Sequence, residues 1–212
     1  MEASFWHERW KLNQIGFHID NTNPLLTNHI GKLNLSKNSR IFLPLCGKTL
    51  DIAYLLDQGF SVVGIELSEV AVTALFNELN VKPEIATINS LKIYKAENIN
   101  IFVGDFFDLN AELLGDIDAI YDRASLIALP VTMRQDYTKH LTKITQNTQQ
   151  LLICLEYDQA AIQGPPFSIS ADEVKQHYDN IYSIQCAESN SISNGKLQNH
   201  NATENAWILK NK

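Results

Sequence analysis

The sequence predicts an α/β fold in which a mostly parallel sheet is covered by helices on both faces. Short apolar runs alternate with helix-like amphipathic stretches through most of the 212 residues, which is the pattern of parallel strands joined by helices. Several of these runs are continuously apolar, as expected for strands buried on both faces. The last two strand-like runs have no helical stretch between them, so we expect an antiparallel hairpin at one edge of the sheet.

The first 35 residues precede this alternation and are predicted to contain two short helices. A short helix capped by Ser4 is expected to contain Trp6 and Trp10, which are four residues apart and share one helix face. A second short helix is expected over residues 25–30. The pattern alone favours the core for the two tryptophans over the alternative of an aromatic lid.

Seven strands are predicted for the sheet. Five core strands are expected at residues 41–45, 60–67, 99–103, 117–121 and 151–155, and two edge strands at 182–186 and 206–209. Residues 91–94 add one arm of a hairpin that leads into the third core strand. A polar loop over residues 188–205 is expected to join the two edge strands.

Helices are predicted between these strands from their apolar spacing and their end signals. They are expected over residues 49–58, 69–80, 130–145 and 170–178. Gly59 ends the first, and Ser68 is expected to cap the second. Ser170 and Glu173 have capping-box spacing at the start of the last helix.

Length, charge and cysteine usage exclude several classes of protein. A chain of 212 residues suits one domain, so we expect a single domain over residues 1–212. The net charge of -7 and the absence of a basic run argue against a nucleic-acid partner. No stretch is long and apolar enough to span a membrane, and the N-terminus lacks the apolar region of a signal peptide. The three cysteines suggest neither a metal site nor a disulfide framework, so we expect a cytoplasmic protein without a metal. Nothing in the sequence demands a partner chain, so we expect a monomer.

In parallel sheets of this kind, ligands bind beyond the carboxyl ends of the strands. Glu66 follows an apolar strand there, 19 residues after Gly47. A carboxylate at this point can accept hydrogen bonds from both ribose hydroxyls of a nucleoside. The alternative is a solvated loop carboxylate.

The loop over residues 44–49 narrows the choice of nucleoside. It contains one glycine, whereas a pyrophosphate-binding loop needs three. It is not a complete phosphate-binding P-loop either, because Phe42 stands where the first glycine is required. The loop therefore favours an adenosyl ligand without phosphate, such as S-adenosylmethionine.

Three further residues at strand ends are candidates for the site. Asp105 could accept a hydrogen bond from an adenine amino group and Phe106 could lie against the purine, although both also suit a helix cap beside a core phenylalanine. Arg123 stands in an apolar surround, where an arginine meets a carboxylate or a ligand. A structural ion pair with Asp122 or Asp158 is the equally weighted alternative.

Six segments, taken together, resemble one known family. They are Phe5-Trp6-x-x-x-Trp10, Gly16-Phe17-His18, Pro44-Leu45-Cys46-Gly47-Lys48, Val63-Gly64-Ile65-Glu66-Leu67-Ser68, Tyr121-Asp122-Arg123 and Gly164-Pro165-Pro166-Phe167. In this order and spacing the set resembles the thiopurine S-methyltransferase family in its bacterial form. The resemblance runs from about Phe5 to Phe167 and weakens beyond Tyr182.

The resemblance implies a Rossmann-like class I methyltransferase sandwich that uses S-adenosylmethionine, with a helical cover over residues 1–35. It implies cofactor contacts at the positions that match the family's motifs, which are Trp10, Leu45, Glu66 and Arg123, with Asp105 and Phe106 on the adenine side. It places Phe17 near the cofactor and the acceptor, and it favours Trp10 as part of a lid. Ser125 stands where we expect a smaller residue.

The activity implied by the resemblance is methyl transfer to the sulfur of aromatic or heterocyclic thiols, with Arg123 as the candidate catalytic residue. Methylation of selenium or tellurium compounds is the first alternative, since bacterial members are linked with it. A nucleotide-binding module of another kind is the second: either an NAD-dependent reductase, which the missing glycines disfavour, or a non-catalytic adenosyl-ligand sensor. A panel of acceptors separates the first two hypotheses, and cofactor binding without turnover on any acceptor would point to the sensor.

Overall fold

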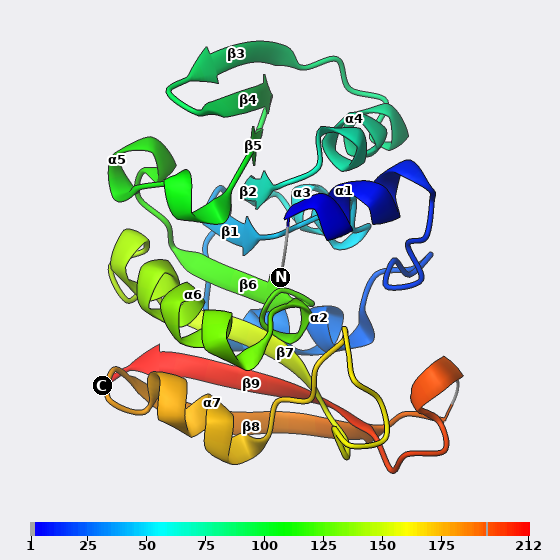
Figure 1. Ribbon diagram of the computed structural model, residues 1–212. Helices are drawn as coiled ribbons and strands as arrows, with labels where there is room; N and C mark the ends of the chain where they lie inside the picture. The colour runs from blue at the N-terminus through cyan, green and yellow to red at the C-terminus, as the bar shows by residue number, and fades with distance from the viewer. Residues whose placement is uncertain (1–2, 194) are drawn as a thin grey trace.

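The computed structural model describes residues 3–193 and 195–212, and the strands in this part of the chain form one mixed sheet (Figure 1). The strands are β1 (Arg40–Pro44), β2 (Ser61–Glu66), β3 (Glu84–Ile88), β4 (Leu91–Ala96), β5 (Ile99–Val103), β6 (Ala119–Arg123), β7 (Gln150–Glu156), β8 (Tyr182–Ser191) and β9 (Thr203–Asn211). They are ordered β3-β4-β5-β2-β1-β6-β7-β9-β8. The five strands in the middle of the sheet, β5-β2-β1-β6-β7, are parallel to one another. The strand pairs at both edges are antiparallel. This confirms a mostly parallel sheet with an antiparallel C-terminal edge.

Helices cover both faces of the sheet. The α-helices are α1 (Ala3–Lys11), α2 (Pro24–His29), α3 (Asp51–Asp57), α4 (Glu69–Glu78), α5 (Ala111–Leu114), α6 (Val131–Ile144) and α7 (Ala171–Tyr178), and the 3-10 turns are η1 (Ile30–Leu33), η2 (Phe106–Asp108), η3 (Leu126–Ala128) and η4 (Gly195–Leu197). None of the helices in the described ranges is long and apolar enough to cross a membrane.

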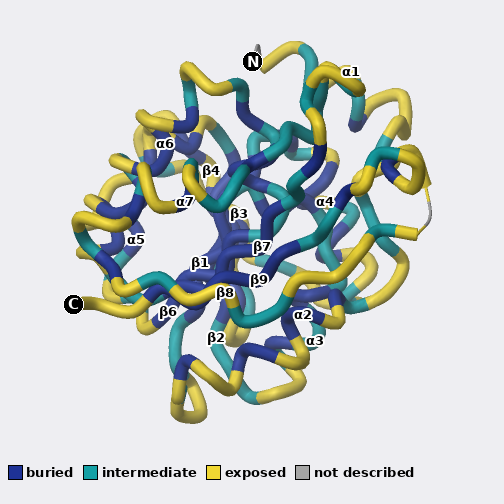
Figure 2. Tube along the Cα trace, turned by 90° about the horizontal axis from the view of Figure 1, so that it is seen from below, coloured by how far each residue is buried: buried dark blue, intermediate teal, exposed yellow. Residues whose placement is uncertain are grey.

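Two apolar cores lie on opposite faces of the sheet, because successive residues of a strand point to opposite sides. Phe42 and Ile120 pack with residues of α6 and α7 on one face. Their neighbours Ile41 and Ala119 pack with residues of α2, α3 and α4 on the other. Figure 2 shows the sheet as the buried centre of the molecule, with exposed segments around it.

Two strands add to the seven of the predicted sheet. β4 is the predicted hairpin arm over residues 91–94, and its antiparallel pairing with β5 confirms that prediction, whereas β3 was not predicted. Four of the five residues of β3 are exposed, so the strand lacks the apolar pattern by which strands are recognised in a sequence. The hairpin is fixed to α4 by Glu69, whose carboxylate lies 2.8 Å from Lys92 Nζ and accepts a hydrogen bond from the Tyr94 hydroxyl at 2.8 Å.

The two edge strands are longer than the sequence indicated. β8 runs to Ser191 and β9 begins at Thr203, so both enter the segment over residues 188–205 that was predicted to be a loop. The backbone ladder continues from Cys186↔Trp207 to Ser191↔Thr203, past a bulge between Cys186 and Glu188. Backbone hydrogen bonds hold this ladder, and polar side chains are tolerated because β8 is a partly exposed edge strand.

The caps predicted for three helices have different outcomes. The Ser170 hydroxyl accepts a hydrogen bond from Glu173 N at the start of α7, which confirms that cap. Ser4 lies inside α1, so its prediction as a cap is wrong. Ser68 precedes α4, but its side chain makes no capping hydrogen bond; instead its backbone N–H donates to Glu66 Oε1 at 2.8 Å.

Candidate functional site

The candidate site lies where the strand order reverses, between β1 and β6. From β1 the chain continues to β2 on one side of the sheet, and β6 continues to β7 on the other side. The β1–β6 ladder runs through Ile41–Ala119 and Phe42–Ile120, whereas β1 pairs with β2 up to Pro44–Ile65. The carboxyl ends of β1 and β6 therefore separate beyond their ladder, and such a crevice is the usual ligand site of this fold.

Glu66 lies at one wall of this crevice and is almost fully buried, with 6% of its surface exposed. Its Oε2 accepts a hydrogen bond from Gly47 N at 2.8 Å, and its Oε1 accepts one from Ser68 N at 2.8 Å. Burial raises the pKa of Glu66, and these backbone donors oppose the rise. A solvated loop carboxylate is therefore excluded.

The carboxylate of Glu66 retains acceptor capacity for a ligand. Each carboxylate oxygen has two lone pairs, and each uses one for the backbone hydrogen bonds just described. A buried acceptor held rigidly at the end of β2 is the group that a ribose diol needs. This arrangement fits an adenosyl cofactor.

The loop after β1 folds back on the end of β2 and is covered by Trp10. Leu45 has a φ of 46° and Gly47 a φ of 55°, and Cys46 N donates to Ile65 O at 3.0 Å. A Cβ atom on Gly47 would lie 3.1 Å from the Trp10 ring, so a side chain at this position would press on the tryptophan. The ring of Trp10 therefore sits directly above the loop.

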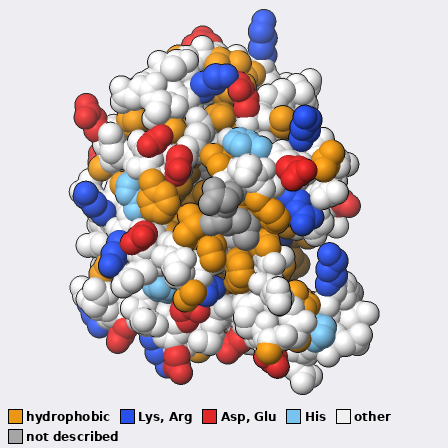
Figure 3. All heavy atoms as spheres, in the orientation of Figure 1, with side chains coloured by type: hydrophobic (Ala, Val, Ile, Leu, Met, Phe, Trp, Pro, Cys, Tyr) orange, Lys and Arg blue, Asp and Glu red, His pale blue; other side chains and the backbone are white. Residues whose placement is uncertain are grey.

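Phe17 packs against the two tryptophans of α1. Its ring packs edge-on against Trp10 at 5.4 Å and against Trp6 at 5.7 Å. Trp10 is buried, whereas Phe17 keeps 38% of its surface exposed. Figure 3 shows the molecule in the orientation of Figure 1, and hydrophobic side chains gather around the middle of the face that is seen. The cover thus presents an aromatic surface that is open to a ligand.

Arg123 ends β6 on the other side of the crevice and is partly exposed. Within residues 3–193 and 195–212 its side chain has no hydrogen-bond or ion-pair partner. Asp122 accepts a hydrogen bond from the Tyr137 hydroxyl at 2.7 Å, and Asp158 accepts one from Ala160 N. Neither of the structural ion pairs that the sequence left open is formed, so the guanidinium is available to a ligand.

Asp105 and Phe106 follow β5 and have different surroundings. Asp105 is exposed and accepts a hydrogen bond from Phe107 N at 2.9 Å, which caps η2. The Phe106 ring is buried against Tyr137 and His140, with centroid distances of 4.9 and 5.0 Å. The ring of Phe106 is thus a core side chain.

Two features near the crevice were not assigned a role from the sequence. The segment over residues 164–167 packs on η3, where Phe167 N donates to Ile127 O at 2.6 Å. Its Gly-Pro-Pro motif was visible in the sequence, but nothing there indicated its neighbour. Ser125 is fully buried, and its hydroxyl donates to Pro44 O at 2.7 Å.

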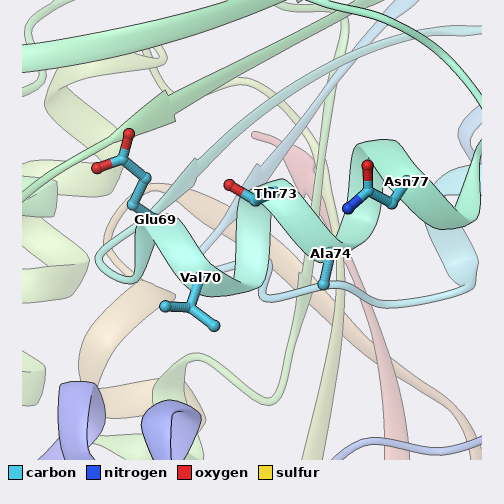
Figure 4. A pocket seen from close by; sticks show the side chains of 5 residues that line it. All are labelled: Glu69, Val70, Thr73, Ala74 and Asn77. Atoms are coloured by element: carbon cyan, nitrogen blue, oxygen red, sulfur yellow. The ribbon is translucent and has the colours of Figure 1, made fainter.

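A separate hollow of about 450 Å³ lies on α4 and is lined by Glu69, Val70, Thr73, Ala74 and Asn77 (Figure 4). These side chains belong to the face of α4 opposite its buried residues. None of the predicted site residues lines it, so it is distinct from the crevice.

Comparison with known sequences gives one family. The family model of thiopurine S-methyltransferase matches residues 1–212. The chain is 48% identical to a thiopurine S-methyltransferase of Teredinibacter turnerae over 99% of this chain and 97% of the relative. It is 45% identical to one of Acinetobacter baylyi over the full length of both.

Solved structures show the same fold at much lower identity. A SAM-dependent methyltransferase from Anabaena variabilis matches with a TM-score of 0.69 at 16% identity, covering 99% of this chain and 95% of its own. Magnesium protoporphyrin IX methyltransferase from Synechocystis, with bound S-adenosylhomocysteine, matches with a TM-score of 0.67 at 12% identity, covering 99% and 100%. The protein is thus an S-adenosylmethionine-dependent methyltransferase with the class I fold, and the chain belongs to the thiopurine S-methyltransferase family.

Proposed function

We propose that the protein methylates the sulfur of aromatic or heterocyclic thiols. The observation that carries this proposal is Arg123, an arginine at the central crevice with no partner among the described residues. Arg123 lies within electrostatic range of His18, and the neighbouring Phe17 keeps an exposed aromatic surface. A cation together with an aromatic surface suits an acceptor that is both planar and anionic.

We propose that the cofactor is held across the crevice. Glu66 accepts the hydrogen bonds of the ribose hydroxyls, and the Leu45 loop supports the amino-acid part under the Trp10 ring. Asp105 receives the adenine amino group, with η2 and Phe106 beneath it. The positions of these residues at the ends of β1, β2 and β5 support this assignment.

S-adenosylmethionine supplies a methyl group that is already activated on a sulfonium. The protein therefore has to position the acceptor and exclude water, which supplies a large part of the rate enhancement of a two-reactant transfer. Arg123 remains charged at all physiological pH values. Its charge favours the thiolate form of the acceptor and orients it, and Phe17 supports the acceptor ring.

Transfer of labelled methyl from S-adenosylmethionine to 6-mercaptopurine by the purified protein tests the proposal. Methylated product supports it. Binding of S-adenosylhomocysteine without product on any thiol would contradict it and would direct the search to selenium and tellurium acceptors. Loss of both binding and product would also contradict the cofactor placement.

A further inference from the structure

Two residues of the crevice have a backbone conformation that non-glycine residues avoid. Leu45, at the end of β1, has a φ of 46°, and Ala124, directly after Arg123 at the end of β6, has a φ of 66°. Each such residue is less favourable by roughly 1–2 kcal/mol than one with negative φ. Strained residues of this kind persist only where the surrounding structure holds them.

One hydrogen bond joins the two strained turns. The hydroxyl of Ser125 donates to the carbonyl oxygen of Pro44 at 2.7 Å. Ser125 follows Ala124, and the Pro44 carbonyl belongs to the peptide unit that leads into Leu45. The bond therefore fixes the orientation of the peptide plane on which the φ of Leu45 depends.

This bond lies where the sheet itself no longer connects the two strands. The β1–β6 ladder ends at Phe42–Ile120, two residues before Pro44. Beyond that point the Ser125 hydroxyl spans the opening between the strand ends. Ser125 is fully buried, so water does not compete for the carbonyl, and loss of the hydroxyl would leave a buried acceptor unpaired.

We infer that Ser125 is a positioning residue, whose hydroxyl bridges the carboxyl ends of β1 and β6 and sets the loop of Leu45 against Arg123 for cofactor binding. This inference rests on the cofactor placement proposed above. Ser125 acts through Pro44 and Leu45 and does not touch the reacting atoms. Its effect is therefore on the affinity for the cofactor more than on turnover at saturation.

The test compares Ser125→Ala with Thr148→Val. The Thr148 hydroxyl makes the same kind of bond, to Ile117 O at 3.0 Å, but at the opposite, amino end of β6. Both variants lose one hydroxyl-to-carbonyl bond, and each is expected to lower the Tm by roughly 2–4 °C. Affinity for S-adenosylhomocysteine is measured by titration calorimetry.

For Ser125→Ala we expect the Kd of S-adenosylhomocysteine and the KM for S-adenosylmethionine to rise by roughly threefold to tenfold. The kcat at saturating cofactor should change by less than about twofold, since the acceptor side is unaltered. Thr148→Val should leave the Kd unchanged. Unchanged affinity in Ser125→Ala, or equal weakening in both variants, would overturn the inference.

Calorimetry also separates this inference from the proposed function. If the unmodified protein binds S-adenosylhomocysteine but methylates no thiol, the acceptor proposal fails and the comparison of affinities still decides the role of Ser125. If thiols are methylated and Ser125→Ala binds as tightly as the unmodified protein, the role of Ser125 alone is refuted.

Discussion

Arg123 combines a permanent charge with the absence of a partner within the described ranges. If it stabilises the anionic acceptor, Arg123→Ala should lower kcat by roughly 10-fold to 150-fold, since a charge-assisted hydrogen bond contributes about 1.5–3 kcal/mol. The Kd of S-adenosylhomocysteine should change by less than about threefold. Arg123→Lys should retain part of the turnover, because it keeps the charge but loses the planar fork.

Single-turnover kinetics and calorimetry on the same preparations measure these two effects. Lys139→Ala, on the exposed side of α6, serves as a control for the loss of a positive charge. If turnover persists in both Arg123 variants, the arginine has no role in the chemistry. If only the affinity falls, Arg123 holds the cofactor instead.

Asp122 lies next to Arg123 but belongs to the core. Burial raises the pKa of Asp122 to about 6, against the hydrogen bond from Tyr137. The folded protein therefore binds a proton more tightly than the unfolded chain, and stability falls as pH rises from about 4 to about 6. Asp122→Asn lacks this titration. Its free energy of unfolding, relative to the unmodified protein, should rise by up to about 3 kcal/mol between pH 4 and pH 7.

Urea unfolding of both proteins at several pH values measures this difference. A difference that is constant across pH 4–7 would show that Asp122 titrates in the folded protein as it does in the unfolded chain. Asp136→Asn, an exposed neighbour on α6, is the matched control and should show no such trend.

Residue positions at strand ends could be predicted, but side-chain orientation could not. Glu66 and Arg123 were found because a strand's end is visible in the apolar pattern. The burial of Glu66 depends on the fold-back of Gly47 onto it, and the inward turn of the Phe106 ring depends on Tyr137 and His140. Both depend on contacts that are distant in sequence and leave no local signal.

At the scale of the element, α7 is held to α6 by a nearly buried ion pair. Arg134 Nε lies 2.8 Å from Glu173 Oε1, with 7% and 19% of the two side chains exposed. Glu173→Ala leaves the guanidinium without its partner, so we expect a loss of about 2–4 kcal/mol in the free energy of unfolding. Urea unfolding measures it.

The same turn of α7 offers a matched control. Asp172 lies 3.5 Å from Lys175 and its side chain is 95% exposed. Asp172→Ala should change stability by less than about 0.5 kcal/mol, because an exposed pair is screened by water. Asp172 and Glu173 are both acidic residues in the first turn of α7. Equal effects in the two variants would therefore mean that the ion pair of Glu173 contributes nothing beyond an acidic side chain at a helix start.

The elements with an apolar periodicity were predictable, and those without it were not. The central strands and α6 have clear patterns in the sequence. The exposed strand β3 and the outer parts of β8 and β9 exist because neighbouring backbone donors and acceptors pair with them. Such strands depend on their partners more than on their own side chains, so a local pattern does not reveal them.

At the scale of the whole molecule, the last strand in the sequence is not the last in the sheet. β9 lies between β7 and β8, and the sequence predicted the edge hairpin without this order. Alternate residues of β9 enter the two cores. Trp207 and Leu209 pack into the core on the side of α6 and α7, and Ala206 and Ile208 pack into the core on the opposite face. We propose that residues 1–212 form one domain, since the C-terminal strand completes both cores that the site elements share.

Removal of β9 therefore tests whether the molecule folds as a unit. A chain that ends at Ala202 leaves the β7 edge unpaired and deprives β8 of its partner, and we expect it to lose its near-ultraviolet circular dichroism and its binding of S-adenosylhomocysteine. A chain that ends at Lys210 lacks only exposed residues and should unfold as the full protein does. If the shorter chain kept a cooperative unfolding transition and bound the cofactor, the site would fold independently of the C-terminal edge. The one-domain proposal would then be wrong, because both cores would be complete without the strand that enters them.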